Sequence, residues 1–168
     1  MSHLEHQSAA ASIVTRCAII TLSDTRTLET DASGQLIQSL VERSQHQVVS
    51  RQLIRDDPAA LARLLEPMLP GSDVDVIITT GGTGISQRDQ TIDAIDRLIE
   101  HPLPGFGELF RMLSWQQIGS AAMLSRAVGG IAKGKVIFAL PGSTNAVELA
   151  MNQLILPQLA HLVRELQK

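Results

Sequence analysis

The chain has 168 residues, of which 44% are hydrophobic and 18% are charged, and its formal net charge is −3. This length and composition predict one folded domain with a packed core, while the acidic balance and the 2% aromatic content argue against a nucleic-acid-binding surface. A lone cysteine excludes an internal disulfide or a cysteine zinc cage, and no apolar segment approaches the ~20 residues that span a bilayer.

The first 15 residues are small and polar, and they predict a flexible arm ahead of a single domain over 16–168. They lack the basic and apolar parts of a signal peptide, so we expect a cytoplasmic protein without a membrane partner. The run RCAIITL (16–22) is typical of a buried strand, in which Cys17 serves as a small hydrophobic residue. A polar loop and a helical repeat of leucine, isoleucine and valine over 36–41 follow, and HQVVSRQLI (46–54) predicts a second strand.

Asp57 and Pro58 are typical of a helix start, and the helix that they open should end at residues 70–71. The sequence VDVIITT (74–80) is apolar on both faces, as a central parallel strand requires. Thr91 is the expected cap of the next helix, with Asp93 in its first turn.

The segment PGFGELFRMLSWQQIG carries one helical stripe, which either covers the sheet or meets a neighbouring subunit; its residues are Phe106, Leu109, Phe110 and Leu113. KVIFAL (135–140) is another buried strand, and Pro157 should kink or split the last helix. Because strands alternate with helices, the chain predicts an α/β fold whose mostly parallel sheet is covered on both faces. Ligands of such folds bind outside the carboxyl ends of the strands, which selects the loops 23–34, 80–91 and 141–144.

The loop TTGGTG (79–84) is the strongest candidate for a phosphate or nucleotide site. Glycines bring backbone N–H groups close to a ligand, and successive N–H groups form a concave anion site. The alternative is a tight strand-to-helix turn that needs glycine for its geometry alone. The spacing matches neither the Walker loop nor the dinucleotide-binding fingerprint, which weakens the usual NTPase and dehydrogenase interpretations.

Asp89 follows the glycine loop, where a carboxylate would repel a bare phosphate. A magnesium ion between them resolves this conflict, since Mg²⁺ is commonly held by one or two carboxylates and by substrate phosphates. Asp56 is a candidate for the second carboxylate, although it and Asp57 also suit the capping of the next helix. Ser23 and Asp24 are placed to contact a sugar or a base edge, or to form a local turn.

Five motifs in this order resemble one family: SDTR, TTGGTGISQRDQT, PGFGELFRMLS, SRAVGG and PGSTNA. The chain is similar, over about residues 16–165, to the MoaB/MogA family of molybdenum cofactor biosynthesis proteins, which is related to the gephyrin G domain. The sequences of its motifs most resemble the MoaB branch of that family. The resemblance implies a three-layer α/β/α fold and a homo-oligomer, either a trimer or a dimer of trimers (a hexamer).

The resemblance also implies an activity, the adenylylation of molybdopterin by ATP with Mg²⁺ and the release of pyrophosphate, with GTP not excluded as the nucleotide. The acidic pair that matches the family's catalytic and metal-binding residues is Asp56 and Asp89. The residues that match its nucleotide- and pterin-binding loops are Ser23, Asp24, Thr80, Gly81, Gly82, Thr83, Gly84, Ser125, Arg126, Pro141, Gly142 and Ser143. Two alternatives stay open: a binding protein of the same pathway that holds pterin or nucleotide without turnover, and a scaffold that uses the fold for assembly.

Overall fold

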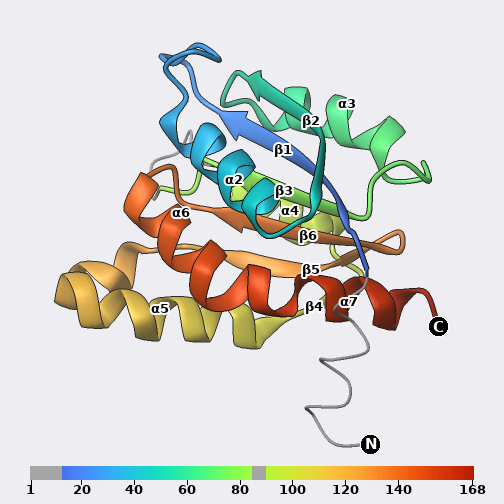
Figure 1. Cartoon of the computed structure of the whole chain (residues 1–168). Helices are drawn as coiled ribbons and strands as arrows, with labels where there is room; N and C mark the ends of the chain where they lie inside the picture. The colour runs from blue at the N-terminus through green and yellow to red at the C-terminus, as the bar shows by residue number, and fades with distance from the viewer. Residues whose placement is uncertain (1–12, 85–89) are drawn as a thin grey trace, which may run out of the picture.

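The structure is a computed structural model, and it describes residues 13–84 and 90–168. Within these residues one six-stranded sheet has the order β2-β1-β3-β6-β5-β4 (Figure 1). Four neighbouring strands are parallel: β2 (Gln47–Ile54), β1 (Arg16–Leu22), β3 (Val76–Thr80) and β6 (Lys135–Leu140). Strand β5 (Val128–Ala132) is antiparallel to β6, and β4 (His101–Pro102) is antiparallel to β5.

Helices cover both faces of the sheet, so the molecule has three layers (Figure 1). One face carries α2 (Ala32–Arg43), α5 (Pro104–Ile118), α6 (Thr144–Ala150) and α7 (Leu159–Leu166). The other face carries α3 (Pro58–Met68) and α4 (Thr91–Leu98). The predicted fold class, α/β with a mostly parallel sheet, is therefore confirmed. No helix in the described part of the chain is long and apolar enough to cross a membrane.

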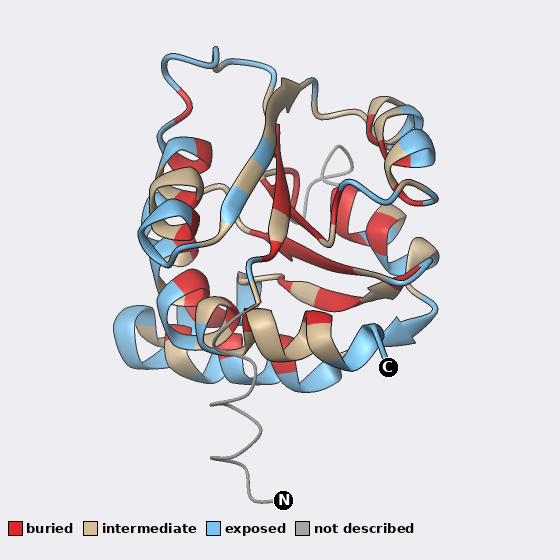
Figure 2. Cartoon of the chain, turned by 45° about the vertical axis from the view of Figure 1, so that its right-hand side comes forward, coloured by how far each residue is buried: buried red, intermediate tan, exposed pale blue. Residues whose placement is uncertain are grey.

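The central strands are buried on both sides, and β1 shows how the sequence achieves this (Figure 2). Alternate side chains of a strand point to opposite faces; Cys17 and Ile19 pack beneath α2 and α6, while Ala18 and Ile20 pack beneath α3 and α4. Cys17 is fully buried, as predicted, and burial raises the pKa of its thiol to about 11. At neutral pH the thiol stays protonated and serves as a hydrophobic residue.

The C-terminal helical region changes its winding before Pro157. Helix α6 continues as a π-helical turn, η2 (Met151–Ile155), and then as a 3₁₀ turn, η3 (Leu156–Gln158), before α7 begins. Proline lacks the N–H that an α-helical interior requires and crowds the preceding turn. The predicted split of this helix is thus confirmed.

The stripe on α5 is divided between core and surface, so the prediction that it forms one face is only partly right. Phe106 and Phe110 are buried and Leu113 is partly buried, whereas Leu109 is 46% exposed. Phe106 packs on Phe138 of β6, with the ring centroids 4.8 Å apart. The two phenylalanines therefore anchor α5 to the sheet, while Leu109, Met112, Trp115 and Ile118 of the same helix are exposed.

The chain packs against the domain before β1 begins. Ile13 packs against the core on the sheet face that carries α2, α5, α6 and α7, and Thr15 is fully buried. The backbone N–H of Thr15 donates to Nδ1 of His46 at 3.3 Å, and burial lowers the pKa of that imidazole, which favours the neutral form that accepts the bond. Residues 1–12 lie outside the described residues, so the flexible arm stays a prediction there.

A salt bridge joins the start of β1 to the segment before β3. Asp75 accepts from the backbone N–H of Arg16 at 2.8 Å and from Arg16 Nε and Nη2 at 3.0 and 2.7 Å. Burial by itself raises the pKa of Asp75, but the hydrogen bonds and charge of Arg16 outweigh it and hold the pKa below its ordinary value of 3.8. A lowered native pKa stabilises the fold above the unfolded pKa, and this contribution is lost as the pH falls through the native value.

We therefore expect Asp75→Asn to lower the free energy of unfolding at pH 7 by about 1–2 kcal/mol. The expected loss is smaller than for a buried ion pair, because Arg16 is partly exposed and solvent screens its charge. Below pH 4 the difference between the variant and the wild type should shrink, because the wild-type carboxylate protonates. Urea unfolding at pH 7 and pH 3 measures both effects. Asp73→Asn is the control, since Asp73 is exposed and two residues away; a difference that persists unchanged at pH 3 would contradict the expectation.

Candidate functional site

The candidate site lies at the edge of the sheet where the parallel strands end. Strands β1, β2, β3 and β6 end at residues 22, 54, 80 and 140, and the loops that follow them meet at this edge. Strand β5 runs in the opposite direction, with Val128 paired to Ala139, so residues just before β5 reach the same edge. This geometry brings together segments that are far apart in the sequence, as expected for α/β sheets.

The glycine loop turns sharply away from β3 at Gly81 and Gly82. These residues have φ values of +97° and +63°, a region that glycine adopts without a steric penalty. The N–H of Gly81 donates to the carbonyl of Leu140 at 3.0 Å, and Thr80 Oγ1 donates to the carbonyl of Pro141 at 3.0 Å. These bonds tie the loop to the end of β6. Because the Gly81 amide is used in this way, a phosphate would meet the loop from Gly82 onward.

The amides further along the loop are differently placed. Within residues 13–84 and 90–168, the N–H groups of Gly82, Thr83 and Gly84 donate to no acceptor. The carbonyl of Gly82 accepts from the Thr91 N–H at 3.2 Å, which fixes the loop to the start of α4. Three consecutive amides on an anchored turn are the arrangement that the predicted phosphate-binding loop requires.

Asp56 lies directly against this loop. Its Oδ1 accepts from Thr91 Oγ1 at 3.3 Å, and a β-carbon on Gly82 would collide with the same carboxylate oxygen. The absence of a side chain at Gly82 therefore allows the carboxylate to approach the backbone. Asp57, in contrast, points to α3 and accepts from the Ala59 N–H at 3.0 Å. Of the two adjacent acids, Asp57 is the helix cap and Asp56 faces the candidate site.

Thr91 does not cap α4 with its side chain, so this prediction was wrong. The residue before the helix is Gln90, which makes no side-chain capping bond, and Thr91 is the first helical residue. Its hydroxyl is directed to Asp56 instead. The threonine thus links α4 to the acidic residue of the site, and the local sequence pattern alone did not reveal this contact.

The loop after β1 contacts the acidic loop after β2. Asp24 Oδ1 accepts from the backbone N–H of Asp56 at 3.3 Å, so the carboxylate of Asp24 lies beside the backbone of residue 56. Ser23 Oγ accepts from the N–H groups of Thr25 and Arg26 at 3.3 and 3.2 Å, which is a local serine turn. Both predicted residues are therefore at the site edge, and Ser23 forms the local turn that was its alternative interpretation.

Arg126 closes the opposite side of the glycine loop. Its Nη1 donates to the carbonyl of Gly84 at 3.2 Å, and its Nη2 donates to Asp93 Oδ1 at 2.7 Å. Ser125 ends the 3₁₀ turn η1 (Gly119–Leu124) and precedes Arg126. Arg126 therefore links the end of the glycine loop to the first turn of α4.

The segment after β6 completes the edge. Ser143 is the N-cap of α6, and its Oγ accepts from the Ala146 N–H at 3.2 Å. The carbonyl of Gly142 accepts from both terminal nitrogens of Arg26. A β-carbon on Gly142 would lie 3.4 Å from the Cα of Gly81, so the two backbones are in contact. Pro141, Gly142 and Ser143 thus lie beside the glycine loop, as the sequence motif predicted.

A buried acid supports the site from beneath. Asp31 caps α2 by accepting from the Gly34 N–H at 2.9 Å, and it also accepts from Thr21 Oγ1 at 2.8 Å, from Ser33 Oγ and from Arg51. Its side chain is fully buried. Sequence reasoning missed this network, because Asp31 sits in a polar loop and its charge partner is in the middle of β2. The network fixes α2 to the end of β1 and to the middle of β2.

The carboxylates of Asp24 and Asp56 are of the type that the predicted magnesium ion would need. Mg²⁺ prefers carboxylate oxygens and keeps several water ligands, and Asp56 presents its carboxylate beside the glycine loop, with Asp24 next to it. Among the described residues, no group of three or more potential ligand side chains surrounds a single point. Asp89, the predicted second metal ligand, lies outside the described residues.

The chain is similar to known proteins over nearly its whole length. A family model described as a probable molybdopterin binding domain matches residues 18–161. Molybdenum cofactor biosynthesis protein B of Bacillus cereus is 50% identical, with 100% of this chain and 99% of that protein covered.

Two solved structures extend the similarity to three dimensions. A crystal structure of a molybdenum cofactor biosynthesis protein B has a TM-score of 0.89 and 50% identity, covering 92% of this chain and 97% of that chain. The tungsten cofactor synthesizing protein MoaB from Pyrococcus furiosus has a TM-score of 0.81 and 35% identity, with coverage of 92% and 98%. Because the family model and these relatives match nearly the whole chain, the protein belongs to the MoaB/MogA family of molybdenum cofactor biosynthesis proteins.

Proposed function

We propose that the chain adenylylates molybdopterin: the terminal phosphate of the pterin attacks the α-phosphate of ATP, a new P–O bond forms, the α–β bond breaks and pyrophosphate leaves. The observation that carries the proposal is the contact of Asp56 with the glycine loop at Gly82. An anchored loop of amides beside a carboxylate suits a ligand that brings phosphates together with a cation. The nucleophile is already an anionic oxygen, so the site needs no strong base.

The residues of the chain would act by positioning. The amides of Gly82, Thr83 and Gly84 would donate to a phosphate, because they donate to no acceptor within the described residues. Arg126 would hold the loop at Gly84. Holding two phosphates in line and donating to the developing negative charge are the main sources of rate enhancement in phosphoryl transfer.

Mg²⁺ bound by Asp56 and Asp89 would neutralise negative charge on the nucleotide phosphates. Asp56 is placed for this by its contact with Thr91, and the adjoining Asp24 holds the backbone of residue 56. Ser23 and Asp24, Ser125 and Arg126, and the segment 141–143 would line the rest of the pterin and nucleotide sites. Preference for ATP over GTP, and location in the cytoplasm, stay predictions.

The test is the transfer of label from ATP, labelled at the α-phosphate, to molybdopterin. The wild type should form the labelled product, and Asp56→Asn should lower the rate by about 10²–10³-fold, as expected when a group that stabilises transition-state charge is removed. Asp57→Asn is the matched control, since asparagine also caps helices well and Asp57 faces α3; its rate should stay near that of the wild type.

The same assay separates the proposal from its alternatives. A chain that binds both ligands but transfers no label would be a binding protein of the pathway. A chain that binds neither ligand while keeping its assembly would be a scaffold. Equal rates for Asp56→Asn and Asp57→Asn would show that Asp56 takes no part in the chemistry.

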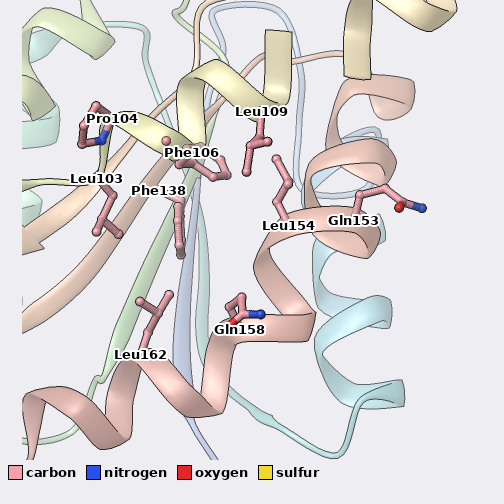
Figure 3. Close-up of a pocket in the computed structure, with 10 residues that line it drawn as sticks. Leu103, Pro104, Phe106, Leu109, Phe138, Gln153, Leu154, Gln158 and Leu162 are labelled. Atoms are coloured by element: carbon pink, nitrogen blue, oxygen red, sulfur yellow. The ribbon is translucent and has the colours of Figure 1, made fainter. Parts of the chain in front are cut away.

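We also propose that the chain works as a trimer or a dimer of trimers, and the apolar surface on α5 and η1 supports this. The exposed apolar residues of this surface are Leu109, Met112, Trp115, Ile118, Met123 and Leu124. A pocket of about 410 Å³ adjoins it, between α5 and the helical turns before α7, and is lined by Phe106, Leu109, Leu154 and Leu162 (Figure 3). Apolar patches of this kind commonly mark subunit contacts.

Light scattering should therefore give a mass of three or six times the 18.1 kDa of the chain. Replacement of Trp115, which is 62% exposed, by glutamate should shift the protein toward smaller species, because a charge would be buried in the contact. A wild-type mass of 18.1 kDa would contradict the assembly proposal.

A further inference from the structure

Arg26 occupies an unusual position among the arginines of this domain. It follows β1 in the loop at the carboxyl edge of the sheet, where its backbone N–H donates to Ser23 Oγ at 3.2 Å. Its side chain is partly buried and reaches across the edge to Gly142, 116 residues later in the chain. Because Gly142 touches Gly81, the guanidinium group lies next to the glycine loop.

The contacts of Arg26 are with neutral oxygens. Its Nη1 donates to Ser33 Oγ at 2.9 Å, and Nη1 and Nη2 donate to the Gly142 carbonyl at 3.4 and 3.3 Å. Within residues 13–84 and 90–168, no carboxylate forms an ion pair with it. Within the described part of the protein its positive charge therefore has no direct carboxylate contact, and Asp31 is reached only through Ser33 Oγ.

Three of the other partly buried arginines form direct ion pairs. Arg16 pairs with Asp75 at 2.7 Å, Arg51 with Asp31 at 3.2 Å and Arg126 with Asp93 at 2.7 Å. A partly buried charge normally requires such a partner, because removal from water disfavours the charged form. Arg26 therefore differs from these arginines in having no direct anionic partner among the described residues.

The N–H groups of Arg26 that remain unused indicate which chemical group a ligand would need to bind there. Arginine has five N–H donors in a rigid plane. The bonds to Ser33 and Gly142 use both Nη1 hydrogens and one Nη2 hydrogen, which leaves Nε–H and the second Nη2 hydrogen on the same side. Two parallel N–H groups of this kind match two oxygens of a phosphate or a carboxylate.

We propose that Arg26 binds a phosphate group of the ligand through Nε and Nη2, and that Ser33 and Gly142 hold the guanidinium in place for it. This rests on the proposed function, which brings phosphates to the same edge. The phosphate belongs either to the nucleotide or to the pterin, and both present the same chemistry to arginine. The bidentate geometry makes Arg26 a binding residue for one of the two substrates.

The test compares Arg26→Gln, Arg26→Lys and the wild type by calorimetric titration with two probes. One probe is a magnesium complex of the ATP analogue with a methylene group between the α- and β-phosphates; the other is molybdopterin. Arg26→Gln should weaken binding of one probe by about 10- to 100-fold, as expected for the loss of two charge-assisted hydrogen bonds, and leave the other within about twofold. The affinity of Arg26→Lys for that probe should lie between those of the wild type and Arg26→Gln, because lysine keeps the positive charge but lacks the two parallel N–H donors of arginine.

Arg43→Gln is the matched control. Arg43 is exposed in the last turn of α2, which at 1.5 Å per residue places it about 16 Å from the start of that helix. Its affinities for both probes should equal those of the wild type. Equal affinities of Arg26→Gln and the wild type for both probes would overturn the proposal. So would an equal loss in Arg26→Lys and Arg26→Gln with a matching fall in Tm, because this pattern indicates a structural role.

Failure of the proposed function gives a different result. If the wild type transfers no label to molybdopterin while Arg26→Gln still weakens phosphate binding, the adenylylation is overturned and the role of Arg26 is supported.

Discussion

Replacing Gly81 with alanine is expected to lower the free energy of unfolding by about 3 kcal/mol or more, because a strained backbone and a steric overlap add at one position. The residue has φ = +97°, and a β-carbon there would collide with the carbonyl oxygen of Leu22 at the end of β1. The colliding atom belongs to the backbone, so the overlap cannot be relieved by rotation of a side chain. The N–H of Gly81 is also bound to Leu140, which prevents the loop from moving away.

Urea unfolding of Gly81→Ala measures the loss, and Gly134→Ala is its control. Gly134 has φ = +72° in the turn between β5 and β6, but a β-carbon added there would meet no atom within 4 Å. Gly134→Ala therefore introduces the backbone strain without the steric overlap, and it should lower the free energy of unfolding by only about 1 kcal/mol. Equal losses in the two variants would show that the contact with Leu22 is relieved by small shifts. Label transfer should fall with Gly81→Ala at temperatures where the variant is still folded.

Replacing Asp31 with alanine should have a similarly large effect, about 3–5 kcal/mol, since this breaks a buried ion pair from one side. Arg51 would lose its carboxylate, and Thr21 and the Gly34 N–H would lose their acceptor. Asp31→Asn should lose less, because asparagine keeps one oxygen and is a good N-cap. Thermal unfolding of the two variants gives this order.

Comparison of Asp31→Ala with Asp57→Ala separates the effect of burial on stability from the effect of helix capping. Asp57 also caps a helix, but 49% of its side chain is exposed, and its ion pair with Arg63 is long at 3.9 Å. Its removal should cost about 1 kcal/mol, the usual value of an exposed cap. If Asp31→Ala and Asp57→Ala lowered stability equally, the buried network would contribute nothing beyond capping.

Sequence reasoning found the four parallel strands: β1, β3 and β6 are largely continuous apolar runs, whereas β2 was found from a mixed run of apolar and polar residues. Strands β1 and β6 were predicted with their observed limits, because both faces of these strands are buried and nearly every position is apolar or small. Strand β5 was missed since VGGIA contains two glycines, which weaken a strand pattern. Those glycines lie where a β-carbon would collide with Phe138 or Ile99, so close packing explains them.

The site could be predicted only where its residues follow a strand directly. The glycine loop and the segment 141–143 were found by this rule, and they meet as expected. Arg126 was known only from a family motif, because its position at the edge depends on the antiparallel direction of β5. The contacts Thr91–Asp56 and Arg26–Gly142 join residues 35 and 116 positions apart, and no local pattern specifies them.

The span of that last contact has a consequence for the growing polypeptide. Arg26 is made early, but its carbonyl partner follows β6, the last strand to be synthesised. Long-range pairings form late because the entropy of closing a large loop must be overcome first. A nascent chain on the ribosome therefore cannot complete the site until Gly142 has emerged from the exit tunnel, so we expect ligand binding only after all four parallel strands are free to pair.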